Sequence, residues 1–125
     1  MRIEANLFEV KEKNPLPGAT YNAIVSAPKL EKSKDSGKDM LVFDFKVIDP
    51  VGADYFDNLR HWIVRQEGAG WATFTMKELC DACGLSYDPT GFDTDDFAGK
   101  MCKIVVEQTI YKDKMVNKIV HFLKS

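Results

Sequence analysis

The sequence is short of the features that mark secreted and membrane proteins. Its three cysteines are an odd number without a paired framework, which argues against a disulfide scaffold and favours a reducing, cytoplasmic compartment. The apolar runs, of which residues 40–43 are among the longest, fall far below the roughly 20 residues that cross a bilayer. Charges at Arg2, Glu4 and Glu9 interrupt the start of the chain, so we expect neither a signal peptide nor a membrane contact.

An excess of positive charge is also missing. The chain has 17 Lys and Arg against 19 Asp and Glu, a net charge of −2, which argues against a protein whose whole surface binds polyanions. The charges are nevertheless uneven, because basic residues gather in 29–38 and 103–124 while acidic residues crowd into 78–96. Each run taken alone is explained by an ordinary solvated loop, so its meaning depends on the fold.

What the sequence does contain is a regular pattern of apolar residues. Its 125 residues, 45% of them hydrophobic, suffice for one folded domain with a real core. Alternation of apolar and polar residues, together with turn-forming residues between the runs, predicts five strands. These strands cover residues 20–30, 40–48, 56–64, 100–110 and 115–123. Between the third and fourth strands, helical spacing predicts a helix over 70–84, with Gly84 as its C-terminal cap.

The predicted order is β-β-β-α-β-β. A helix between the third and fourth of five strands is the order of the OB-fold, a Greek-key barrel whose helix covers one end. We therefore expect an all-β barrel with one helix, a single five-stranded OB-fold domain over residues 1–125 with an N-terminal extension at 1–18. A different small α+β roll, with one helix on an antiparallel sheet, has the same order and remains an alternative.

The OB hypothesis gives the basic residues a common place. In OB-folds, oligonucleotides bind to the face of strands 2 and 3 and to the loops that join strands 1–2 and 4–5. Lysine and arginine neutralise phosphates, and bases stack on aromatic rings with about 1–3 kcal/mol each and little sequence preference. The residues predicted on this face are Lys32, Lys34 and Lys38 in the first loop, Lys46 on the second strand, Arg60, Trp62 and Arg65 on or just after the third strand, and Tyr111, Lys112 and Lys114 in the second loop. Trp62, flanked by Arg60 and Arg65, is the best local candidate for base stacking.

Four stretches of the chain carry a family resemblance: LPGATY at 16–21, MLVFDFKVID at 40–49, LCDACGL at 79–85 and DFAGK at 96–100. In this order they resemble the phage-encoded single-stranded-DNA-binding proteins of OB type, long catalogued as a phage family of unknown function. The resemblance covers about residues 8–123. It implies a non-enzymatic protein that coats single-stranded DNA with little sequence preference during phage replication or recombination, in the host cytoplasm. Replication or recombination proteins of the phage or host would be its further partners.

Other constellations are explained more simply. Cys80 and Cys83 form a C-x-x-C inside the predicted helix, where buried small apolar residues are a better interpretation than a redox pair or a zinc site. The acidic loop 88–96 lacks the spacing of an EF-hand. We expect no cofactor, no metal and no catalytic residues.

Two further functions stay open. The first is a protein-interaction module, of OB or α+β type, that uses the acidic helix or the loop of Phe92 and Phe97 and does not bind nucleic acid. The second is a metal-dependent nuclease. Asp44 and Glu107 could pair as catalytic carboxylates across strands, although nothing in the sequence places a nucleophile or metal beside them.

Overall fold

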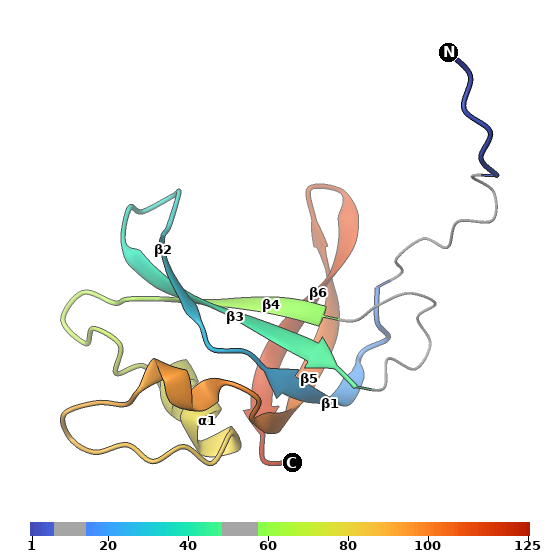
Figure 1. The fold of residues 1–125 in the computed structure, drawn as a ribbon. Helices are drawn as coiled ribbons and strands as arrows, with labels where there is room; N and C mark the ends of the chain where they lie inside the picture. The colour runs from blue at the N-terminus through green and yellow to red at the C-terminus, as the bar shows by residue number, and fades with distance from the viewer. Residues whose placement is uncertain (7–14, 49–57) are drawn as a thin grey trace.

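Six β-strands form one antiparallel sheet in this computed structural model, which describes residues 1–6, 15–48 and 58–125 (Figure 1). The strands are β1 (Ala19–Val25), β2 (Lys29–Lys32), β3 (Asp39–Val47), β4 (Asn58–Val64), β5 (Met101–Tyr111) and β6 (Lys114–Leu123). The sheet runs in the order β2-β3-β1-β5-β6, and β4 pairs with β3. The helix α1 (Phe74–Ala82) and the short 3-10 helix η2 (Thr94–Phe97) follow β4 in the chain. The prediction of a β-rich domain with one α-helix before the last two strands is confirmed for the described residues.

The first predicted strand is divided in two. The sequence predicts one strand over 20–30, whereas the structure has β1 and β2, which both pair with β3. Pro28 lies between them and has no N–H to donate to a strand ladder. The break at Pro28 gives the described residues six strands instead of the expected five. Both halves stay in one sheet because they share β3 as their partner.

The sheet is not closed into the expected barrel. Closure requires pairing between β4 and β6, and no such ladder forms in the described part of the chain. The two strands meet through side chains instead: the rings of His61 and Phe122 contact edge to face, with centroids 5.2 Å apart. On β6, the backbone N–H of Phe122 donates to Glu78 Oε1 of α1 at 2.9 Å. The Glu78 side chain of α1 therefore accepts the hydrogen bond that the Phe122 N–H would otherwise have free for a strand closing the barrel.

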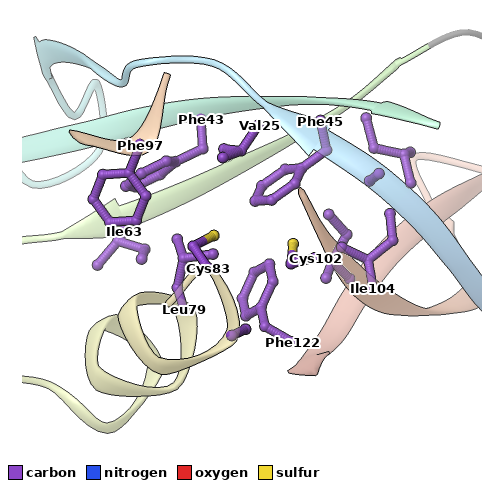
Figure 2. Close-up of a cluster of buried hydrophobic side chains, with 14 of the residues drawn as sticks. Val25, Phe43, Phe45, Ile63, Leu79, Cys83, Phe97, Cys102, Ile104 and Phe122 are labelled. Carbon is purple, nitrogen blue, oxygen red and sulfur yellow. The ribbon is translucent and has the colours of Figure 1, made fainter. Parts of the chain in front are cut away.

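The core follows the predicted alternation. Phe43 and Phe45 of β3 are fully buried, and so are their inward-facing counterparts on β1 and β5, Val25 and Ile104. Leu79 of α1 meets this cluster from below the sheet (Figure 2).

The acidic loop 88–96 runs directly into a part of the core. Its end forms η2, which inserts the fully buried Phe97 against Phe43, ring centroids 5.1 Å apart. An apolar side chain in a polar stretch thus acts as an anchor for the loop.

The helix is shorter than the predicted 70–84. It begins after Thr73, whose side chain accepts a hydrogen bond from the N–H of Met76 at 3.1 Å. The residues before it form a turn instead, closed by reciprocal backbone hydrogen bonds between Gln66 and Gly70. Gly84 takes a positive φ of 68° just beyond the last turn, as predicted for the C-terminal cap.

The predicted N-terminal extension, 1–18, is partly built into the domain. Leu16 is fully buried, and its backbone is held by Asn117, which accepts from the Leu16 N–H at 2.8 Å and donates to its carbonyl at 2.9 Å. Gln108 donates to the same carbonyl. The folded body therefore includes Leu16, whereas residues 7–14 of the predicted extension lie outside the described residues.

The hairpin of β5 and β6 extends beyond the core. Its two-residue turn, Lys112 and Asp113, has positive φ at both positions, as a type I′ turn requires. Along β5 the alternation of buried and exposed residues stops after Val106, and every residue from 107 to 111 is exposed. We call residues 107–116 the hairpin arm. No helix in the described residues is long and apolar enough to cross a membrane.

Candidate nucleic-acid interface

The outer face of β3 and β4 carries three of the predicted site residues. Cross-strand pairing places Trp62 opposite Val42, Arg60 opposite Asp44 and Lys46 opposite Asn58. These positions alternate with the buried ones, so their side chains lie on the face away from the core. Trp62 is 52% exposed, whereas Val42, its partner in the ladder, is only 5% exposed. The exposed ring of Trp62 thus lies beside a buried valine side chain on the same strand face.

Arg60 is not an isolated cation. Its Nε lies 3.1 Å from Asp44 Oδ1, and both side chains are more than a third exposed. Such a surface pair contributes about 0–1 kcal/mol, little enough for an incoming phosphate to replace the carboxylate. The sequence places Asp44 on this face, but its pairing with Arg60 follows only from the strand register.

Two loops flank this face. The β2–β3 loop carries the exposed Lys34 and Lys38, and the end of the hairpin arm carries Lys112 and Lys114. Figure 1 shows both hairpins projecting in the same direction, on either side of β3 and β4. The structure therefore brings the two predicted loops to the two ends of one surface.

The aromatic residue of the hairpin arm is exposed as well. Tyr111 is 62% exposed, and Lys112 Nζ lies 5.3 Å from the centroid of its ring. This distance is within the range of a cation–π contact. A ring for stacking and an ammonium for a phosphate therefore stand side by side at the tip of the arm.

Two predicted residues are directed elsewhere. Lys32 pairs with Asp39 at 2.6 Å, and its position in β2 gives it the parity of Leu30 and Leu41, on the inner side of the sheet. Arg65 Nε and Nη2 each lie 3.9 Å from where a Cβ on Gly70 would stand, over the turn before α1. The Arg65 side chain therefore lies beside the turn of residues 66–70. For Lys32 the alternation of residues along β2 carries this information, but it can be followed only if a new strand is started after Pro28.

Comparison with known proteins gives the chain a family. A family model described as "Protein of unknown function (DUF669)" matches residues 4–124, almost the whole length. The chain belongs to the DUF669 family. No curated protein matches it. Because the description of the family assigns no activity, the function of this DUF669 protein has to be argued from its surface.

Sequence reasoning gave no role to one exposed pair of the DUF669 chain. Ile110 and Met115 face each other across the hairpin arm and are 69% and 46% exposed. They lie on the opposite face of the arm from Tyr111 and Lys114, since successive residues of a strand alternate. The sequence signal for this pair is the presence of apolar residues, Ile110 and Met115, close to the polar turn at residues 112–113.

The titratable groups inside the DUF669 fold are shielded. Burial, with a smaller contribution from the positive charge of the nearby Lys118, lowers the pKa of His61 to about 4. Burial raises the pKa of Cys80 to about 11, and a hydrogen bond with the Cys102 thiol, together with burial, raises the pKa of Cys83. In the part of the chain that the structure describes, no three His, Cys, Asp or Glu side chains gather as a metal site needs. The C-x-x-C thiols are therefore protonated, buried and chemically quiet.

Proposed function

We propose that this protein binds single-stranded DNA along the outer face of β3 and β4, between the β2–β3 loop and the hairpin arm. The observation that carries the proposal is Trp62, a half-exposed ring on a packed strand face with lysine-bearing loops on either side. An exposed ring in such a place is ready to stack on an unpaired base, and stacking tolerates any sequence.

We propose further that the fold is of OB type. The ladders β1–β3, β3–β4, β1–β5 and β5–β6 support this, because they are those of an OB-fold whose first strand is split into β1 and β2. OB barrels are partly open. The seam between β4 and β6 is compatible with that architecture. The proposed DNA face then coincides with the face that OB-folds use for oligonucleotides.

The distribution of charge supports the same face. Five exposed lysines lie on the outer face or in the two loops: Lys34, Lys38, Lys46, Lys112 and Lys114. The acidic residues of 78–96 belong instead to α1 and the segment after it, which lie under the sheet (Figure 1). Local potential at the binding face governs affinity for a polyanion more than net charge does. A net charge of −2 is therefore compatible with binding on one side.

The proposed biological role follows from the resemblance of stretches such as 16–21 and 40–49 to phage-encoded single-stranded-DNA-binding proteins. On this proposal the protein is not an enzyme; it coats single-stranded DNA during phage replication or recombination in the host cytoplasm. Replication or recombination proteins are its proposed further partners.

Fluorescence titration with oligo(dT) at two salt concentrations tests the proposal. Trp62 is expected to be quenched on binding, and affinity is expected to fall steeply with salt because lysine–phosphate contacts release counterions. A triple variant, Trp62→Ala with Lys112→Ala and Lys114→Ala, is expected to bind at least about tenfold more weakly through lost stacking.

The matched control changes two exposed lysines away from this face, Lys100→Ala and Lys124→Ala, and is expected to bind nearly as the wild type does. Absence of binding at low salt contradicts the function. Full-strength binding by the triple variant contradicts the site while leaving the function standing. Incubation of the DNA with protein and Mg²⁺ or Mn²⁺ is expected to leave it intact, and degradation would point to the nuclease instead.

A further inference from the structure

The inner side of the β2–β3 hairpin faces an apolar groove. The groove has a volume of about 790 Å³ and lies between β2, α1 and the segment around residues 87–94. Leu30 stands over it with 65% of its surface exposed, and Trp71, Met76 and Phe92 line it further down. Pockets of this volume accommodate several apolar side chains. The groove therefore offers an unfilled apolar surface on the side of the sheet away from Trp62.

Acidic residues lie in this groove and beside it. Asp88 lines it, and Asp93 and Asp96 line an adjoining hollow that shares Asp88 and Phe92 with it. The one lysine in the lining of the groove, Lys77, is paired with a carboxylate of its own helix at 3.2 Å. We call this site the acidic groove. An occupant that fits it carries apolar side chains together with positive charge.

The hairpin arm of the same protein has this chemistry. Ile110 and Met115 form an exposed apolar pair on one of its faces, and the adjoining turn carries two lysines, Lys112 and Lys114, against the single Asp113. Figure 1 shows the arm at the opposite end of the molecule from α1 and the segment of residues 87–94, which line the groove. The arm therefore cannot fill the groove of its own chain, but it can fill that of another copy.

We propose that the hairpin arm of one molecule docks into the acidic groove of a second copy. Ile110 and Met115 enter the apolar part beside Leu30, and the carboxylates of Asp88, Asp93 and Asp96 attract the positive charge of the arm. The contact joins two different surfaces, so each molecule keeps one free arm or groove and the association continues as a row. Tyr111 and Lys114 lie on the other face of the arm, where DNA contacts remain open to them.

This self-association goes beyond the proposed function, because it requires no DNA. Analytical ultracentrifugation of the protein alone therefore tests it over a range of concentrations. The wild type is expected to form species of increasing size as its concentration rises. The arm variant combines Ile110→Ser with Met115→Ser, and the groove variant carries Leu30→Glu alone. Each is expected to associate at least about tenfold more weakly than the wild type, because anchor residues carry most of the affinity of an interface. All three side chains are substantially exposed, so folding is expected to survive.

Mixing the two variants gives the sharpest result. The arm variant keeps an intact groove and the Leu30→Glu variant keeps an intact arm, so together they are expected to form a 1:1 dimer that does not grow. The control is Met101→Ser, which removes a side chain 47% exposed on β5 outside both surfaces and is expected to associate as the wild type does.

Two outcomes overturn the proposal. One is a wild type that stays monomeric at about 1 mM, a concentration at which a contact with a Kd of about 1 mM or tighter would be substantially occupied. The other is a pair of variants that fails to form the mixed dimer while the wild type associates, because the contact then lies elsewhere. Neither outcome bears on binding of single-stranded DNA, which is measured separately with short oligonucleotides.

Discussion

At the scale of single residues, the side chains divide cleanly between the two faces of β3 and β4. Phe43, Phe45 and Ile63 pack inward, whereas Arg60 and Trp62 lie outward. Alternation along a strand predicted this division from the sequence, since it depends only on the period of two residues. The ion pair of Arg60 was not predictable in the same way, because it depends on which residue of the neighbouring strand stands opposite.

His61 makes stability depend on pH. Its pKa is lowered to about 4 in the folded protein, from an ordinary value of 6.5, mainly by burial. The unfolded chain therefore binds the proton of His61 more tightly than the folded protein does. The stability that comes from burying neutral His61 is fully present above pH 6.5 and is lost as pH falls toward 4. At pH 5 we expect a loss of about 2 kcal/mol from this residue.

The comparison is between the wild type and His61→Phe, which keeps an aromatic ring against Phe122 without a titrating group. Urea unfolding at pH 7 and pH 5 is expected to show a smaller loss of stability in the variant. Equal losses in both proteins would show that His61 does not titrate as its burial implies.

The three cysteines are expected to react slowly. Cys80, Cys83 and Cys102 are buried, and a Cys80 pKa of about 11 leaves little thiolate at pH 8, the reactive form. Labelling with a charged disulfide reagent is expected to be slow in the folded protein and complete for all three thiols in denaturant. Rapid labelling of two cysteines in the folded state would revive the interpretation of the C-x-x-C as a redox pair.

At the scale of elements, α1 and β6 are joined by a polar contact in an otherwise apolar interface. Glu78 accepts from the backbone N–H of Phe122 at 2.9 Å and lies 3.5 Å from the ring of His121. The helix itself was predicted from its apolar spacing, but this contact was not. The two partners are more than 40 residues apart, and only the packing of α1 against the sheet brings them together.

Substitution of Glu78 tests this contact. Glu78→Ala leaves the Phe122 N–H without its acceptor, and we expect unfolding to become easier by about 1–3 kcal/mol. Glu78→Gln keeps an acceptor oxygen and is expected to lose less. Chemical denaturation measures both, with Glu107→Ala, an exposed glutamate on the hairpin arm, as the control. A Glu78→Ala protein as stable as this control would show that the contact contributes nothing.

At the scale of the whole molecule, two surfaces of different character lie on opposite sides of one sheet. The outer face and its loops are basic and aromatic, and the acidic groove below is apolar with Asp88, Asp93 and Asp96 in it or beside it. If both proposals hold, binding of DNA and association of neighbouring molecules reinforce each other, and the protein coats DNA cooperatively.

The length of the DNA separates the two surfaces. Leu30→Glu is expected to bind an oligonucleotide that holds one molecule with wild-type affinity, because Leu30 lies in the acidic groove. On long poly(dT) the same variant is expected to bind without the cooperative gain, so its apparent affinity falls below that of the wild type. Equal binding of both proteins at both lengths would show that the acidic groove plays no part in coating.

The sequence by itself determined the β-rich class, the position of the helix, the inward and outward residues of β3 and β4, and the turn of the hairpin arm. Each of these depends on local periodicity or on the conformational preferences of a few neighbouring residues. Only the tertiary structure decided that the sheet stays open between β4 and β6, that Leu16 and Phe97 complete the core, and that Arg65 lies beside the turn before α1. These features depend on contacts between distant segments, whose geometry follows from the packing of the whole chain.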